Sequence, residues 1–255
     1  MTTATMDKKP GAKVVSPADW LTARKQLLAK EKEFTRLRDE LSRQRREMPW
    51  EKVEKKYVFE GANGQGTLAD LFAGRSQLIV YHFMFGPGWK EGCPSCSFLA
   101  DAFDSAVIHL AQRDTTFVAV SRATLPEIDL FKKRMGWKFK WVSSNGSDFN
   151  YDYQVSTGNG ETAGNKVYYN YTLTEFPSDE RPGLSVFFKK DADVFHTYST
   201  YARGLDILLP TYNFLDMTAK GRDEADMKPH AMAWVRHHDR YSDGKMVDIG
   251  KLTAR

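Results

Sequence analysis

The N-terminal part of the chain has an amphipathic pattern with helical spacing. A stripe of large apolar residues recurs every seven positions: Trp20, Leu27, Phe34, Leu41 and Met48. Ser16, Pro17 and Asp19 are typical of a helix start, with Ser16 as the N-cap and Asp19 placed to close a capping box. We therefore expect one long helix over 17–47. Its stripe must be buried, either on the protein's own body or against a second copy, so a homodimer is one expectation.

Beyond residue 50 the pattern changes to short runs typical of an α/β domain. The run at 77–85 is apolar on both faces apart from His82, so we expect a central strand there. Further strands are expected at 54–60, 115–121, 138–142 (an edge strand), 184–189 and 194–199. Helices are expected at 67–72, 97–112, 125–135 and 204–214, with a turn at 61–66 and a loop-rich end at 216–255.

These patterns predict two parts of unequal size. Residues 1–56 form an N-terminal arm that contains the amphipathic helix, and residues 57–255 form the main domain. An insertion at about 143–182 is polar and glycine-bearing. It holds a group of tyrosines, which fits either a small core of its own or a groove wall: Tyr151, Tyr153, Tyr168, Tyr169 and Tyr171.

Composition and charge narrow the class of protein. Hydrophobic residues make up 41% and charged residues 27%, as in ordinary globular proteins. Residues 1–56 carry 15 Lys and Arg against 9 Asp and Glu, whereas the remainder carries 22 against 24. The body has no basic excess, so we expect no nucleic-acid partner. The apolar run at 78–85 is too short to cross a bilayer and the start lacks a secretory pattern, so we expect a cytoplasmic protein that is not bound to a membrane.

The chain contains two cysteines, Cys93 and Cys96, in C-x-x-C spacing. In a reducing compartment such a pair is more often catalytic or metal-binding than a structural disulfide. A structural zinc site needs four ligands, and no second pair or suitably spaced histidine completes one. The sequence therefore favours a redox pair with no metal and no cofactor.

The position of the pair suits thiol chemistry. Cys93 follows the strand and loop and begins a helix, where free N–H groups stabilise a thiolate. Cys96 falls one turn later and can resolve a mixed disulfide. Pro94 suits the first helical position because its missing N–H has no partner there. We expect Cys93 to be the nucleophile and Cys96 the resolving thiol.

The segment LIVYHFMFGPGWKEGCPSCSFLADAF resembles the strand, tryptophan-bearing loop, C-x-x-C and helix of the thioredoxin superfamily. More closely, the chain resembles an uncharacterised bacterial family described as thioredoxin-like, predicted dithiol–disulfide oxidoreductases. Seven stretches between about 50 and 250 carry this likeness: QLIVYHFMFGPGW, GCPSCSF, VAVSRATL, FKKRMGWKFKWVSS, DFNYD, STYARGLD and YNFLDMTAKGRDE.

The resemblance implies a thioredoxin-like fold, with a central mixed sheet flanked by helices. It also implies thiol–disulfide exchange with a protein or small-molecule disulfide or thiol. Substrate-binding positions would be Trp89, Pro94, Ser95 and Pro182. The segment from Pro182 is similar to the strand that a cis-proline begins beside the redox pair, although its position also fits an ordinary trans proline. Trp89 fits either a substrate wall or a packed loop residue.

Two other functions stay open. A peroxiredoxin-like thiol peroxidase would want Thr or Ser three residues before its cysteine, where Lys90 stands, and a guanidinium that Arg122 or Arg203 could supply. A non-catalytic scaffold on the same fold is the other alternative. Two histidines also have two interpretations each. His82 is either a core residue or a proton shuttle, and His196 points either to the active-site face or to a turn.

Overall fold

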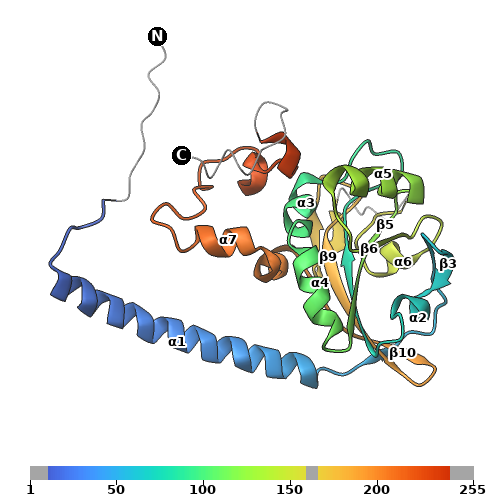
Figure 1. The fold of residues 1–255 in the computed structure, drawn as a ribbon, viewed down its shortest axis with the longest axis horizontal. Coiled ribbons are helices and arrows are strands. Elements are labelled where there is room, and N and C mark those ends of the chain that lie inside the picture. The colour runs from blue at the N-terminus through green and yellow to red at the C-terminus, as the bar shows by residue number, and fades with distance from the viewer. Residues whose placement is uncertain (1–10, 159–165, 242–255) are drawn as a thin grey trace, which may run out of the picture. The chain divides into compact units, whose positions relative to one another are not determined.

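The computed structural model describes residues 11–158 and 166–241 (Figure 1). The chain divides into two compact units. One contains the residues up to Pro49 together with Phe214–Asp223, and the other contains Trp50–Asn213 together with the residues from Glu224 onward. The boundary expected after residue 56 stays a prediction.

The first unit contains the expected long helix, α1 (Pro17–Glu47). The Ser16 hydroxyl oxygen accepts a hydrogen bond from the Asp19 N–H at 3.2 Å and donates to the Asp19 carboxylate at 2.8 Å. These bonds fix the first turn, as the sequence predicts. No side chain of α1 is buried within this unit. The partner of its apolar stripe therefore stays a prediction.

An eight-stranded sheet, in the order β1-β10-β9-β4-β5-β6-β2-β3, forms the centre of the second unit. The central strands β4, β5 and β6 are parallel, and the remaining neighbours are antiparallel. The strands are β1 (Glu51–Lys52), β2 (Val58–Gly61), β3 (Gly64–Thr67), β4 (Gln77–His82), β5 (Thr115–Ser121), β6 (Lys140–Ser143), β9 (Gly183–Lys190) and β10 (Asp193–Tyr201).

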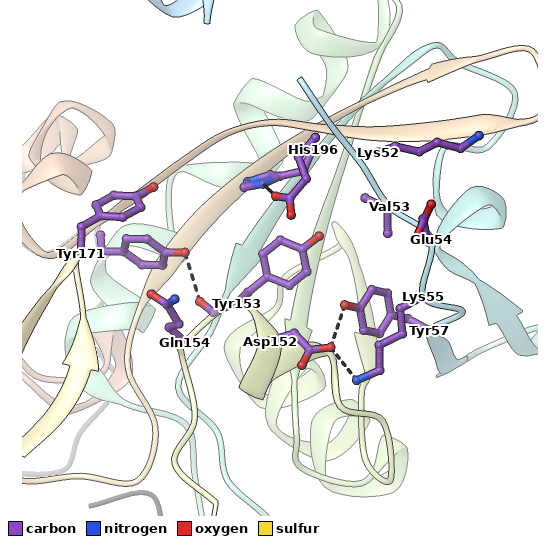
Figure 2. Close-up of a pocket in the computed structure, with 12 residues that line it drawn as sticks. Lys52, Val53, Glu54, Lys55, Tyr57, Asp152, Tyr153, Gln154, Tyr171 and His196 are labelled. Atoms are coloured by element: carbon purple, nitrogen blue, oxygen red, sulfur yellow. Dashed lines mark hydrogen bonds and ion pairs between the residues drawn. The ribbon is translucent and has the colours of Figure 1, made fainter. Parts of the chain in front are cut away.

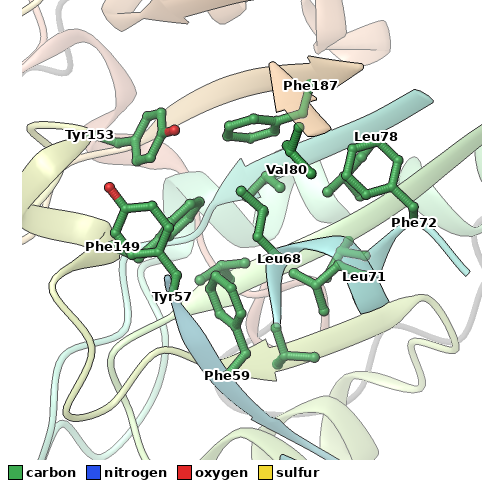
Figure 3. Close-up of a cluster of buried hydrophobic side chains, with 14 residues drawn as sticks. Tyr57, Phe59, Leu68, Leu71, Phe72, Leu78, Val80, Phe149, Tyr153 and Phe187 are labelled. Atoms are coloured by element: carbon green, nitrogen blue, oxygen red, sulfur yellow. The ribbon is translucent and has the colours of Figure 1, made fainter. Parts of the chain in front are cut away.

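Helices cover both faces of this sheet (Figure 1). On one face, Tyr81 packs against Phe103 of α4 (Phe103–Ala111), and Phe83 packs against Phe131 of α5 (Leu125–Met135). On the other face, α2 (Leu68–Leu71) and α6 (Phe149–Asp152) close a core that includes Leu78, Val80 and Phe187 (Figure 3). The remaining helices are α3 (Pro94–Ala100), η1 (Ala202–Leu208), α7 (Pro210–Leu215), η2 (Ala231–Trp234) and η3 (His238–Arg240).

The connections agree with the expected fold. The chain crosses from β4 through α3 and α4 to the parallel strand β5, then through α5 to β6, and the antiparallel strands β9 and β10 follow. A mixed sheet flanked by helices, with the cysteine pair after the central strand β4, is the thioredoxin-like fold that the sequence predicts. No helix in the two described ranges combines the length and apolar character that a bilayer crossing requires.

Several local predictions were wrong. β6 is an interior strand, because Glu60 of the β2–β3 hairpin pairs with Ser143 and covers its far side. The hairpin itself replaces most of the expected turn at 61–66, with Gly64 at φ +92°. The helix expected at 97–112 begins earlier and is split into α3 and α4. The helix expected at 204–214 is η1 followed by α7, interrupted before Pro210, which cannot donate within a helix.

The insertion folds into α6 and a separate two-stranded sheet of β7 (Lys166–Tyr169) and β8 (Thr172–Glu175). Tyr169 packs with Val155, Val167, Phe176 and Tyr201 in a small core of its own. The tyrosines do not act as one group, since Tyr153 belongs to the main core and Tyr171 is exposed.

Strand β10 contains a β-bulge at Thr197. His196 pairs with Phe187 and Tyr198 with Val186, so Thr197 has no opposite residue in β9. A bulge adds one residue to one strand and changes the alternation of side chains along it. His196 and Ser199, three residues apart, therefore reach the same face of the sheet.

Candidate functional site

The two cysteines lie where the loop after β4 turns into α3. The Cys93 N–H donates to the carbonyl of Met84 at 3.0 Å, which fixes the end of the loop. Cys93 is the N-cap of α3 and Pro94 occupies the first turn. The Cys93 carbonyl accepts from the N–H and the hydroxyl of Ser97, each at 2.9 Å. The structure therefore places the pair at the strand-to-helix junction that the sequence predicts.

The environments of the two thiols differ. Both cysteines are free thiols, and Cys93 is half-buried while Cys96 is 2% exposed. The pKa of Cys93 is lowered to about 7, chiefly by a hydrogen bond from the Cys96 thiol. Burial alone would raise this pKa, but the N–H groups of Cys96 and Ser95 and the Ser95 hydroxyl also lower it. Burial, together with the bond to Cys93, raises the pKa of Cys96 well above its ordinary value. At neutral pH this arrangement favours a thiolate at Cys93 and a protonated thiol at Cys96.

Tyr81 lies beneath the buried thiol. Its side chain is 1% exposed, and burial raises its pKa well above the ordinary value. The Tyr81 hydroxyl hydrogen-bonds the Cys96 sulfur, a contact that lowers the pKa of that thiol against the larger effect of burial. Sequence reasoning missed Tyr81. The available signal was its position near the end of β4, one residue before His82 and shortly before the cysteine loop.

The C-terminal segment holds the loop that precedes Cys93. His237 is 3% exposed, and its Nε2 lies 2.8 Å from the carbonyl oxygen of Gly92. Its Nδ1 lies 3.1 Å from Nη2 of Arg134, a group that can only donate. His237 is thus a neutral imidazole that carries its proton on Nε2 and donates it to Gly92. Burial lowers the pKa of His237, in agreement with the neutral form.

Ion pairs reinforce this attachment. Arg134 of α5 pairs with Glu91 in the cysteine loop and, at 2.8 Å, with Asp239 of η3. Arg240 pairs with Glu91 at 2.7 Å. Gly92 has no room for a side chain, because a Cβ atom would lie 2.6 Å from the ring of Phe83. The residue before Cys93 is therefore fixed from both sides.

The residues expected to bind substrate differ in placement. Pro94 is exposed, and Ser95 faces the Cys93 sulfur. The Trp89 indole folds back onto Gly86 within its own loop, so the packed-loop interpretation describes it. The peptide bond before Pro182 is trans, since the cis bond among the described residues is Lys228–Pro229.

Pro182 directly precedes Gly183, which pairs with His82 at the end of β4. The carbonyl of Pro182 accepts a hydrogen bond from the Tyr169 hydroxyl at 2.7 Å. The cis-proline that the resemblance suggested is therefore absent, although Pro182 lies at the strand end where it was expected.

The arginines considered for peroxide chemistry are engaged elsewhere. Arg122 pairs with the buried carboxylate of Glu180 at 2.6 Å. Arg203 pairs with Asp206 at 2.9 Å, with an exposed side chain. Within the described ranges, no group of three or more His, Cys, Asp or Glu side chains is arranged to hold a metal ion.

Comparisons with known proteins give a family and a set of structural neighbours. Residues 9–241 match the family described as "Bacterial protein of unknown function (DUF899)". No curated protein matches the chain. The match covers most of the sequence, and the chain belongs to this family.

Similar solved structures include a PrxQ mutant, a peroxidoxin and a 2-Cys peroxiredoxin. A PrxQ mutant from Xylella fastidiosa is 14% identical, with 62% of this chain and 88% of that chain covered and a TM-score of 0.40. Peroxidoxin BcpB from Mycobacterium tuberculosis is 14% identical, with 64% and 95% covered and a TM-score of 0.42. The mitochondrial 2-Cys peroxiredoxin from Plasmodium falciparum is 12% identical, with 70% and 96% covered and a TM-score of 0.39.

Proposed function

We propose that this member of the DUF899 family is a thiol–disulfide oxidoreductase in which Cys93 is the nucleophile and Cys96 the resolving thiol. The observation that carries the proposal is the opposite shift of the two thiol pKa values. The pKa of Cys93 is lowered to about 7 and that of Cys96 is raised. A thiolate that forms near neutral pH beside a protonated partner is suited to attack a disulfide.

The reaction balances with the two cysteines alone. The Cys93 thiolate attacks one sulfur of a substrate disulfide, forming a mixed disulfide and releasing the first substrate thiolate. Cys96 then loses its proton and attacks the Cys93 sulfur, which releases the second substrate thiolate. The substrate gains two electrons, its two thiolates take up the Cys96 proton and one proton from water, and the protein is left with a Cys93–Cys96 disulfide. The Tyr81 hydroxyl supports the second step, because it donates to Cys96 and stabilises the thiolate that forms there.

A thiol peroxidase would need a positive group free to bind peroxide beside Cys93. Lys90 stands where that chemistry wants Thr or Ser, and the guanidinium of Arg122 is held by Glu180. These two observations favour disulfide exchange over peroxide reduction.

The test is a glutathione redox titration of the purified protein beside an insulin-reduction assay and a peroxide-consumption assay. We expect a reversible two-electron couple and insulin reduction that Cys93→Ser abolishes. Cys96→Ser should accumulate a mixed disulfide with glutathione, visible by intact mass. Rapid peroxide consumption that survives Cys96→Ser, without insulin reduction, would establish the peroxidase instead. Thiols that never pair would leave a non-catalytic scaffold.

A further inference from the structure

A cavity of about 480 Å³ lies on the face of the sheet opposite the cysteines. Tyr81 points toward Cys96, whereas the next residue, His82, points to the other face and stacks on Tyr153 at 5.8 Å between ring centroids. Successive side chains of a strand face opposite sides of a sheet. Tyr153 lines the cavity (Figure 2), so the cavity is separate from the redox pair.

The walls of the cavity are rich in tyrosine rings. Tyr57, Tyr153, Tyr171 and Tyr201 all line it. One of these rings already contacts a cation, because the Lys55 ammonium lies 5.8 Å from the centroid of Tyr57. Aromatic faces attract organic cations through the ring quadrupole, and the attraction grows as water is excluded.

The cavity lining holds carboxylates whose negative charge no described Lys or Arg offsets, whereas its lysines are paired. Lys52 pairs with Asp193 at 2.8 Å, and Lys55 pairs with Asp148 and Asp152 at 2.8 Å each. Both lysine charges are therefore compensated by neighbouring acids. Glu51 and Glu54 also line the cavity, and neither pairs with a Lys or Arg among the described residues. Two carboxylates thus remain without a full cationic partner.

A buried hydrogen-bonded chain fixes one wall. His196 Nε2 lies 2.7 Å from the Ser199 hydroxyl oxygen, Ser199 lies 2.8 Å from that of Ser185, and Ser185 lies 2.8 Å from His82 Nε2. The other nitrogen of His196 lies 3.4 Å from the Glu51 carboxylate. The Thr197 bulge makes this chain possible, since it turns His196 and Ser199 to one face.

The direction of the hydrogen bond between His82 and Ser185 follows from the surroundings of His82, at the buried end of the chain. His82 Nδ1 has no partner among the described residues. An unprotonated nitrogen without a partner costs less than an unpaired buried N–H, so His82 carries its proton on Nε2 and donates it to Ser185. The two serine hydroxyls then link His82 to His196, whose Nδ1 lies 3.4 Å from the Glu51 carboxylate.

A further polar group in the cavity has no partner. Tyr153 is only 9% exposed, and its hydroxyl forms no hydrogen bond with any described residue. In Figure 2 this hydroxyl points into the cavity. A nearly buried hydroxyl aimed into a cavity is placed to bind a polar group of a ligand.

We propose that this cavity binds a small organic cation, an alkylammonium compound that also carries a hydroxyl group. The tyrosine rings and the Glu51 carboxylate hold the ammonium group, and the Tyr153 hydroxyl takes the hydroxyl of the ligand. The site does not depend on the thiols, so it stands apart from the proposed redox function.

The test uses choline, ethanolamine and the neutral carbon isostere of choline, 3,3-dimethylbutan-1-ol, with the full-length protein and isothermal titration calorimetry. We expect at least one of the two cations to bind about tenfold more tightly than the isostere, because charge and not shape is recognised. Glu51→Gln and Tyr171→Leu should each weaken the cation several-fold. Asp129→Asn removes the same charge from the exposed surface of α5 and should leave the affinity unchanged.

Two readouts keep the proposal falsifiable. Thermal melts of each variant separate lost binding from lost folding. The double variant Cys93→Ser, Cys96→Ser should bind the cation as tightly as the unmodified protein, whether or not the redox activity exists. Equal binding of cation and isostere, no binding of either cation at millimolar concentration, or an affinity that Glu51→Gln does not change would overturn the proposal.

Discussion

The imidazole Nε2 of His237 lies 2.8 Å from the carbonyl oxygen of Gly92, although 145 residues separate the two in the chain. Gly92 directly precedes Cys93, so a contact from His237 helps to fix the loop that leads into Cys93. Arg134 holds the other nitrogen of the same ring at 3.1 Å. A residue far from the cysteines in sequence is thereby a positioning residue for them.

Replacing His237 by Ala should loosen this loop. The change removes a buried hydrogen bond and leaves the Gly92 carbonyl without it, which should cost about 1–3 kcal/mol of unfolding free energy. Cys93 should also lose part of its fixed hydrogen-bond geometry, so the pKa of its thiol should move up toward the ordinary value. Chemical denaturation and the pH dependence of iodoacetamide labelling measure the two effects.

The matched control is the neighbouring residue. His238 pairs with Asp101 at 2.7 Å on the surface, with a side chain 42% exposed. His238→Ala should cost under about 1 kcal/mol and leave the labelling profile unchanged. Equal effects of the two substitutions would show that His237 has no special role in positioning Cys93.

Labelling of the reduced protein should distinguish the two thiols. The thiolate is the reactive form, so iodoacetamide should modify Cys93 at a rate that rises with pH and is half-maximal near its pKa of about 7. Cys96 should resist labelling to higher pH, because its pKa is raised. Cys96→Ala removes the largest cause of the Cys93 shift and should move that midpoint upward. Peptide mapping that finds the modification first on Cys96 would reverse the proposed roles.

Tyr81→Phe should slow the second half of the reaction selectively. The substitution removes the hydroxyl that donates to Cys96 and retains the ring that packs against Phe83 and Phe103. Hydrogen bonds to charged groups contribute about 1.5–3 kcal/mol, so resolution of a mixed disulfide should slow by about tenfold or more. Quenched-flow mass measurements follow the mixed disulfide directly. An unchanged lifetime beside unchanged Cys93 labelling would exclude this role for Tyr81.

His82 should make the protein acid-sensitive. Burial, with a smaller effect of His196, lowers the pKa of His82 to about 3, whereas in the unfolded chain it titrates near its ordinary value of 6.5. The unfolded state therefore binds this proton more tightly, and the stability contributed by neutral His82 is lost as the pH falls from about 6.5 toward 3. The slope is about 1.4 kcal/mol per pH unit.

Replacing His82 by Leu should remove this slope, as urea titrations between pH 7 and 4 would show. His109→Leu, on the exposed side of α4, serves as the control and should retain it. A wild-type stability that does not decrease over this range relative to His82→Leu would contradict the neutral buried state of His82.

The sequence predicted the centre of the molecule well, because its signals there are local. A continuous apolar run, a glycine-bearing loop and Pro94 after Cys93 lie within twenty residues of one another and together fix the strand, the loop and the helix start. The long helix α1 was predictable for the same reason. Its start depends on Ser16 and Asp19, and its stripe repeats every seven residues.

The errors concern features that depend on distant partners or on backbone geometry. Tyr81 lies in a strand that is apolar on both faces between Gln77 and His82, so the pattern does not show which of its residues face the cysteines. The role of His237 depends on a contact with a loop 145 residues away. β6 became an interior strand only because the β2–β3 hairpin returns to pair with it. In the expected helix at 204–214, Pro210 marks a break that periodicity alone did not reveal.

The bulge at Thr197 also bears on how related sequences can be compared. Thr197 is the residue of β10 that has no opposite residue in β9, and the pairs on either side of it continue in step. A relative one residue shorter at this point would preserve the pairing of His196 with Phe187 and of Ser199 with Ser185. An alignment gap at position 197 would therefore be compatible with an unchanged sheet, whereas a gap at position 199 would remove Ser199 from the buried histidine–serine chain.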